Sequence, residues 1–207
     1  MKICFEGPSG IGKTTICREM EKDYVIIPEV NVLFKGEKNE GRLWYFQKQV
    51  ERYQLSQRTK KVIFDGDIFQ PFWYNWTYNY PDGFLSLKEM SRLYLEEIKK
   101  KNITFPDLYL VFYTSIENLI HRKANDLTRN RGNFEKHLKL IETLPLYFQF
   151  MQKSFPKMVS LIQYDSVYQV KPLIEAAISE RGNTTYDSLR IFQTMVDWLS
   201  KNEPGGN

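Results

Sequence analysis

Residues 7–14 read Gly-Pro-Ser-Gly-Ile-Gly-Lys-Thr, and this stretch decides the fold of the chain. It lies between a short apolar segment, Ile3–Phe5, and a predicted helix that begins at Lys13. Its glycines allow backbone N–H groups to converge on phosphate oxygens at a helix N-terminus, where the helix dipole also favours anions. Lys13 supplies a cation for the β- and γ-phosphates, and Thr14 supplies a hydroxyl for Mg²⁺. The stretch is therefore a P-loop, and we expect it to bind a nucleoside triphosphate.

The composition is that of an ordinary globular protein. The 207 residues are enough for one domain with a real core, and 42% hydrophobic with 26% charged residues is typical of such chains. The net charge of +4 is a mild excess, which does not indicate a nucleic-acid partner. No apolar run approaches the roughly 20 residues that span a bilayer, and residues 1–6 lead straight into the motif without room for a signal peptide. We therefore expect a cytoplasmic protein that binds neither nucleic acid nor membrane.

Short apolar segments alternate with longer amphipathic ones, a pattern typical of a parallel sheet covered by helices on both faces. The expected strands are residues 3–5, 24–27, 61–65, 107–112 and 159–164. The expected helices are residues 13–21, 43–55, 87–98, about 115–123, one from about 134 that Pro145 should kink or interrupt, 170–180 and 189–199. The predicted fold class is α/β, a three-layer α/β/α P-loop NTPase with a five-stranded parallel sheet and an arginine-rich lid. We expect residues 1–181 to form this domain, residues 182–202 a helical extension packed on it, and residues 203–207 a disordered tail.

A P-loop indicates the ligand but not the reaction, and three classes of protein compete. A GTPase should carry a base-reading Asn-Lys-x-Asp after a strand, but the nearest string, at residues 122–126, has the wrong order. An assembly ATPase usually has adjacent Asp and Glu at a strand end, whereas the third predicted strand ends in Asp65-Gly66-Asp67. The pattern therefore favours the third class, the small-molecule kinases.

Four features, in the same order, resemble the P-loop nucleoside and nucleotide kinases, particularly the thymidylate kinase and deoxynucleoside kinase group. They are the P-loop, the turn at residues 27–30 (Ile-Pro-Glu-Val), the strand end at residues 63–67, and the strand at residues 106–111 with the helix and arginine-rich segment that follow it. Together they span residues 1 to about 180, although only the P-loop is specific by itself. The resemblance implies ATP as the phosphoryl donor, with Mg²⁺, and a nucleoside or nucleotide as the acceptor.

The arginine-rich segment lies where these kinases carry a lid. Arg122, Arg129 and Arg131 can close over the triphosphate, neutralise charge on the transferred group and exclude water. Phosphoryl transfer depends mostly on positioning and on such neutralisation. The plainer alternative is that these arginines only keep an exposed connection soluble.

Three carboxylates are candidates for the metal site and for the catalytic base. Asp65 emerges from a buried strand beside the P-loop strand, where it can hold Mg²⁺ together with Thr14. Glu29 matches the glutamate that acts as base toward the substrate hydroxyl in deoxynucleoside kinases. Asp67 is a second candidate for the base or a second metal anchor, or else it caps the helix that follows.

Gly66 departs from the family pattern, because these kinases carry an arginine that binds phosphate or substrate at this position. The departure weakens the case for a nucleotide monophosphate as acceptor, unless Arg42, Arg52 or Arg58 around the second predicted helix takes over that role.

Aromatic residues gather between Phe69 and Tyr80. Flat rings stack well on a nucleobase, so we expect Phe69, Trp73 and Trp76 to supply the one or two side chains that line the acceptor pocket. Their spacing also fits a helix packed into the core, which is the role expected for most of this stretch.

The predicted function is an ATP-dependent phosphotransferase that moves the γ-phosphoryl group to a small acceptor, a nucleoside or nucleotide. Two alternatives stay open: a kinase of another small hydroxyl compound, such as an antibiotic or metabolite, and a nucleotide-dependent switch ATPase. A small-molecule acceptor is the expected partner, and a second copy of the chain is left open as another. The predicted catalytic residues are Lys13, Glu29, Asp65, Asp67, Arg129 and Arg131; the nucleotide contacts are Gly7, Ser9, Gly10, Ile11, Gly12, Lys13, Thr14, Thr15 and Arg122; the substrate contacts are Glu29, Phe69, Trp73 and Trp76; and the metal ligands are Thr14 and Asp65.

Overall fold

The computed structural model describes residues 1–37, 41–124, 134–166 and 169–204. Its centre is a five-stranded sheet in the order β2-β3-β1-β4-β5, in which every neighbouring pair runs parallel. The strands are β1 (Lys2–Glu6), β2 (Val25–Ile27), β3 (Val62–Asp65), β4 (Leu108–Tyr113) and β5 (Val159–Gln163). The predicted parallel α/β sheet is therefore confirmed, with each strand within about a residue of its expected position.

Successive side chains of a strand point to opposite faces of a sheet, and both faces of this sheet are buried. In β1, Ile3 and Phe5 join one core cluster, whereas Cys4 between them joins the other. In β3, Val62 and Phe64 share the cluster of Cys4, whereas Ile63 lies with Ile3. This double burial explains why the strands read as unbroken apolar runs rather than as alternating polar and apolar residues.

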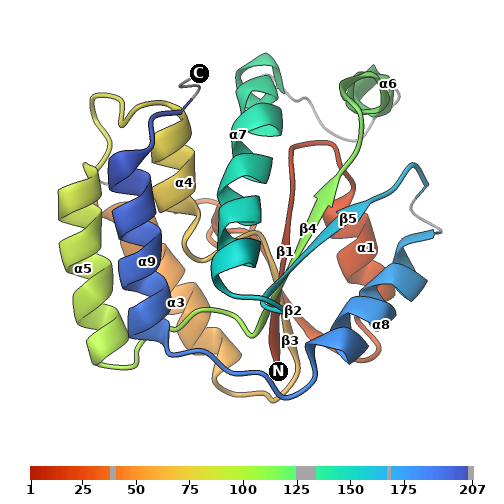
Figure 1. The fold of residues 1–207 in the computed structure, drawn as a ribbon, viewed down its shortest axis with the longest axis horizontal. Coiled ribbons are helices and arrows are strands. Elements are labelled where there is room, and N and C mark those ends of the chain that lie inside the picture. The colour runs from red at the N-terminus through yellow and green to blue at the C-terminus, as the bar shows by residue number, and fades with distance from the viewer. Residues whose placement is uncertain (38–40, 125–133, 167–168, 205–207) are drawn as a thin grey trace.

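Helices cover the two faces unequally (Figure 1). On one face lie α3, α4, α5, α7 and α9, and on the other lie α1, α6 and α8. The helices of the described residues are α1 (Lys13–Glu19), α2 (Val30–Leu33), α3 (Trp44–Ser56), α4 (Gln70–Thr77), α5 (Leu87–Lys99), α6 (Ile116–Ala124), α7 (Phe134–Ser154), α8 (Val170–Arg181) and α9 (Ser188–Lys201). The last of them, α9, packs on α5 and α4 and so completes the thicker helical layer.

The helix α7 runs unbroken through Pro145, contrary to the predicted interruption. Proline removes one backbone hydrogen bond inside a helix. Leu144, Tyr147 and Phe148 on either side are buried in the core, and this packing holds the helix together across the gap. No helix among the described residues is both long enough and apolar enough to cross a bilayer.

The topology places several chain segments at one edge of the sheet. In a parallel sheet the carboxyl ends of all strands lie at the same edge. Ligands bind at this edge, at the point where successive connections run to opposite sides of the central strand. Here β1 lies between β3 and β4, and the P-loop follows it directly. The ends of β2 and β3, with Glu29 and Asp65, therefore lie beside the P-loop.

Candidate active site

The P-loop wraps closely against the end of β4. A Cβ atom on Gly7 would lie 2.5 Å from the carbonyl oxygen of Phe112, so only glycine allows the chain to pass there. Gly12 then adopts φ 105° as the N-cap residue of α1, and the helix begins at Lys13. The backbone donors of the first helical turn thus face the loop, which is the arrangement that binds phosphate.

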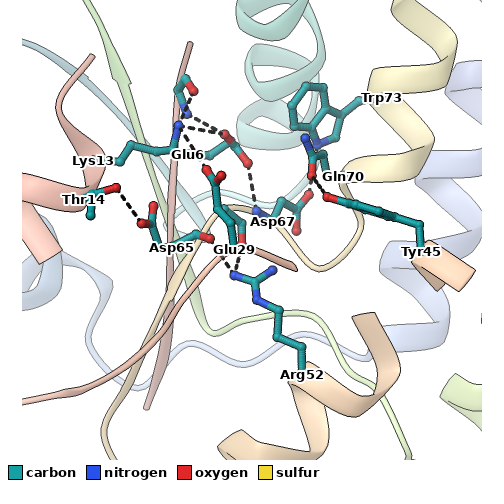
Figure 2. Close-up of polar contacts among 12 residues, drawn as sticks. Glu6, Lys13, Thr14, Glu29, Tyr45, Arg52, Asp65, Asp67, Gln70 and Trp73 are labelled. Atoms are coloured by element: carbon teal, nitrogen blue, oxygen red, sulfur yellow. Dashed lines mark hydrogen bonds and ion pairs between the residues drawn. The ribbon is translucent and has the colours of Figure 1, made fainter. Parts of the chain in front are cut away.

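The Lys13 ammonium lies at the centre of the site (Figure 2). Its Nζ donates to the Gly7 carbonyl oxygen at 2.8 Å and lies 3.9 Å from Glu6 Oε1 and 3.8 Å from Glu29 Oε1. Burial by itself would lower the pKa of Lys13, but the Glu6, Glu29 and Asp65 carboxylates outweigh it, and the pKa is raised. Lys13 is therefore held as a cation at the point where a triphosphate would bind.

Glu6, at the end of β1, is a functional candidate that the sequence analysis missed. Its two carboxylate oxygens accept from the backbone N–H groups of Gly7 and Asp67, each at 2.8 Å, so it joins the start of the P-loop to the turn after β3. Burial raises the pKa of Glu6 to about 7, although Lys13 and the Gly7 N–H oppose the shift. The available signal was a carboxylate directly after the apolar run Ile3–Phe5, at the point where the strand leads into the P-loop.

Thr14 and Asp65 meet beside Lys13, as the prediction of a shared metal site requires. The Thr14 hydroxyl donates to Asp65 Oδ2 at 3.0 Å. The other carboxylate oxygen, Oδ1, is buried without a hydrogen bond to any described residue, and burial raises the pKa of Asp65. An unpaired buried oxygen next to a hydroxyl fits Mg²⁺, which takes one or two protein ligands and completes its shell with phosphates and water. No group of three or more His, Cys, Asp or Glu side chains that could hold a metal is present among the described residues.

Asp67 does not face the P-loop, which corrects its predicted role as base or metal anchor. Its side chain is fully buried and accepts from the Phe69 N–H at 3.0 Å, the Trp73 Nε1–H at 3.1 Å and the Tyr109 hydroxyl at 2.9 Å. Burial raises the pKa of Asp67 to about 6, although these three donors stabilise the charged carboxylate and oppose the shift. Asp67 thus orders the entry to α4, close to the capping role that was its alternative.

Glu29 pairs with Lys13 in the lining of the cleft and is 44% exposed, so a ligand can reach it. It follows β2 as the N-cap residue of the short helix α2. Gly66 lies against it with φ +88°, and a Cβ there would come 3.3 Å from Glu29 Cγ. A larger residue at position 66 would strain the turn and press on Glu29, which gives a physical reason for the glycine.

Arg52 is almost fully buried and does not reach the cleft. Its guanidinium donates to the carbonyl oxygens of Pro28 at 2.6 Å, Asp65 at 2.6 Å and Gly66 at 2.8 Å. It therefore ties the end of β2 to the end of β3 and fixes the residues that carry the Glu29 and Asp65 side chains. Its suggested role in place of the missing arginine is wrong, because its donors are taken by main-chain carbonyls and by the Gln49 side chain.

The cleft above the sheet has a volume of about 1330 Å³ and divides into two parts. We call the P-loop side, residues 7–15 with Arg18 and Arg122, the triphosphate half. We call the opposite side the acceptor half. Its aromatic, apolar and amide lining includes Tyr45, Gln70, Tyr74, Phe84, Leu85 and Tyr94.

Phe69, Trp73 and Trp76 do not line the cleft, which corrects their prediction as substrate contacts. Their side chains are at most 2% exposed and belong to the core between the sheet and the thicker helical layer. The helical spacing in the sequence identified the buried side of α4 correctly. The cleft side of the same helix carries Gln70 and Tyr74 instead.

Arg122 lies on α6 beside the P-loop and lines the cleft. Its guanidinium donates to the carbonyl oxygens of Ile11 and Asp165, each at 2.8 Å, and lies over the Tyr164 ring. These contacts keep it next to the expected triphosphate site. Arg129 and Arg131 lie outside the described residues.

Solved structures with the same architecture are nucleoside and nucleotide kinases. A deoxyadenosine kinase from M. mycoides with bound dATP is 17% identical, with 85% of this chain and 98% of that chain covered and a TM-score of 0.58. The thymidylate kinase from Candida albicans is 15% identical, with 90% and 95% covered and a TM-score of 0.59. The chain therefore has the fold of the P-loop nucleoside and nucleotide kinases. No protein-family model matches the sequence, and no curated protein does.

Proposed function

We propose that the protein is an ATP-dependent phosphotransferase that acts on a small hydroxyl compound, a nucleoside or nucleotide. The observation that carries the proposal is the pairing of Lys13 with Glu29. The phosphate-binding cation and an accessible carboxylate lie 3.8 Å apart, and both line the cleft. A simple nucleotide-binding loop needs no such carboxylate, whereas transfer to a hydroxyl gains from a base at this place.

The reaction follows from this arrangement. The acceptor hydroxyl oxygen attacks the γ-phosphorus, the bond from that phosphorus to the β,γ-bridging oxygen breaks, and the products are a phosphomonoester and ADP. Glu29 takes the proton that the hydroxyl loses. Lys13 and P-loop amides hold the phosphates while negative charge shifts toward the leaving ADP.

Mg²⁺ fits the pair Thr14 and Asp65, whose hydroxyl and unpaired carboxylate oxygen would hold it. When bound, it would neutralise charge on the phosphate oxygens. Glu6 acts one step further from the substrate, because it positions the start of the P-loop through Gly7 and draws Lys13 toward the loop.

Incubation with γ-labelled ATP, Mg²⁺ and a panel of nucleosides, nucleoside monophosphates and other small alcohols tests this function. We expect label in a phosphomonoester of one nucleoside or nucleotide, and loss of that transfer in Glu29→Gln. Glu21→Gln, just beyond the C-terminal end of α1, is the matched control and should keep full activity. ATP hydrolysis that no acceptor in the panel stimulates would instead support a switch ATPase, and transfer only to the other alcohols would move the assignment to a non-nucleoside kinase.

A further inference from the structure

We infer that the acceptor enters this cleft without a phosphate group, so that the substrate is a nucleoside rather than a nucleoside monophosphate. This inference rests on the proposed kinase function and names the substrate class of the same site. A monophosphate brings nearly two negative charges, which need dedicated cations in a partly enclosed site. The charges in the acceptor half decide whether such cations are available.

Arg42 is an arginine in the lining of the acceptor half, and it is already engaged. Its Nη2 donates to Glu89 Oε2 at 3.0 Å and to the Phe84 carbonyl oxygen at 2.5 Å. Glu89 is itself held, because its carboxylate and the Ser86 side chain form a reciprocal cap at the start of α5. The pair is neutral overall and adds no net positive charge to the cleft.

The turn after β3 adds no cation either. Position 66 is a glycine with φ +88°, a conformation in which an arginine would be strained, and its Cβ would press on Glu29. The nearby Arg52 directs its donors to main-chain carbonyls. Glu29 itself carries a negative charge toward the acceptor, and a second anion there would be repelled.

The remaining cations that line the cleft belong to the triphosphate half. Lys13 and Arg18 project from α1, the P-loop helix, and Arg122 is tied to the Ile11 carbonyl oxygen. ATP carries about four negative charges of its own, which these groups are needed to balance. Among the described residues, therefore, no unpaired cation of the acceptor half can receive a second phosphate.

What the acceptor half does offer suits an uncharged ring compound. The Tyr45 hydroxyl donates to Gln70 Oε1 at 2.7 Å, which orients the Gln70 amide at the cleft wall. Tyr45 and Tyr74 add aromatic surface on the same side. Aromatic faces stack on a base, and an oriented amide hydrogen-bonds to its edge.

The experiment compares the four common deoxynucleosides with their 5′-monophosphates, measuring kcat/KM by transfer of label from ATP. We expect the preferred nucleoside to exceed its monophosphate by at least about 100-fold, the worth of a lost charge-assisted contact and added repulsion. A monophosphate that reacts as well as its nucleoside, or better, overturns the inference even though kinase activity is then established.

Binding separates this inference from the kinase proposal. Calorimetric titration of the same ligands, in the presence of a non-hydrolysable ATP analogue, measures acceptor preference even if no transfer occurs. Tighter binding of a nucleoside than of its monophosphate supports the inference. Equal or tighter binding of the monophosphate, or binding of neither, contradicts it.

Two variants test the role given to Arg42. Glu89→Gln should release Arg42 into the cleft and lower the Kd for the monophosphate about 10-fold, with nucleoside binding unchanged. Glu96→Gln removes the same charge from the same helix outside the cleft lining and should change neither. Arg42→Ala should leave the weak monophosphate affinity of the unmodified protein unchanged. A further drop with Arg42→Ala would show that Arg42 already binds phosphate and would overturn the inference.

Discussion

The two halves of the cleft are built from different parts of the chain. The triphosphate half is built mainly from one continuous segment, residues 7–15, which brings the Lys13 side chain and the start of α1 to the cleft. The acceptor half is built from side chains that start on α3, α4 and α5 and on the loop before α5. A main-chain cradle accepts any triphosphate, whereas a wall of side chains has a shape and polarity of its own. We therefore expect common chemistry in the first half and selectivity in the second.

Asp65 and Asp67 show the same contrast at short range. Only Gly66 lies between them in the sequence, yet the Asp65 side chain contacts Thr14 at the P-loop and the Asp67 side chain is buried among aromatic residues. We expect Asp65 to bind the ligand and Asp67 to stabilise the fold. Some substitutions should therefore lower the rate of phosphoryl transfer, whereas others should lower only the stability of the fold or the selectivity for the acceptor.

The largest effect is expected at Lys13. Lys13→Ala should lower kcat about 1000-fold, because it removes the cation that balances the transferred phosphoryl charge. The melting temperature should fall little, since the lysine is flanked by backbone contacts of the P-loop. Lys22→Ala, a lysine just beyond α1, should keep full activity in the same assay. An active Lys13→Ala protein would contradict the assignment of the triphosphate half.

The second-largest effect is expected at Glu29, and it distinguishes Glu29 from Asp67. Glu29→Gln should lower kcat about 100-fold with the KM for ATP unchanged, because the base is lost but the phosphate cradle is kept. Asp67→Asn should keep kcat within about threefold and lower the free energy of unfolding by about 1–3 kcal/mol, since it disturbs a buried hydrogen-bond network. Steady-state kinetics and urea denaturation measure both. The reverse pattern would move the base to Asp67.

A pH effect on stability is expected from Glu6. The pKa of Glu6 is about 7 in the folded protein, against an ordinary value of 4.5, so the folded state holds the proton more tightly and loses relative stability as the pH rises through this window. The free energy of unfolding of the wild type should fall by about 2 kcal/mol more between pH 5 and pH 8 than that of Glu6→Gln. Parallel curves from urea denaturation at the two pH values would show that Glu6 has an ordinary pKa.

The smallest effect is expected in the acceptor half. Tyr45→Phe should raise the KM for the acceptor about fivefold, because the Gln70 amide loses the hydroxyl that orients it. The KM for ATP should not change. Trp73→Phe, a change in the core behind the same wall, should leave both KM values unchanged while lowering stability. Equal effects of the two variants on the KM for the acceptor would contradict a specific role of the Tyr45–Gln70 hydrogen bond in acceptor binding.

Much of the fold was readable because it depends on local patterns. The apolar runs at residues 3–5 and 107–112 marked buried parallel strands, and helical spacing marked the core side of α4. The predicted interruption at Pro145 was wrong, because the packing of its neighbours compensates for the missing hydrogen bond, whereas the predicted kink stays a prediction. The residues that line the acceptor half could not be predicted from the sequence, because their side chains come from separate helices.

The sequence by itself determined the P-loop, the positions of the strands along the chain and the presence of carboxylates at their ends, since each of these depends on residues adjacent in the chain. Only the tertiary structure decided that Glu29 faces Lys13, that Asp67 turns into the core and that Arg52 braces the turns between them. These outcomes depend on contacts between residues far apart in the chain, such as Thr14 and Asp65, which lie 51 positions apart. Where a side chain points at the end of a strand is set by what packs against it, and that information is in no single segment.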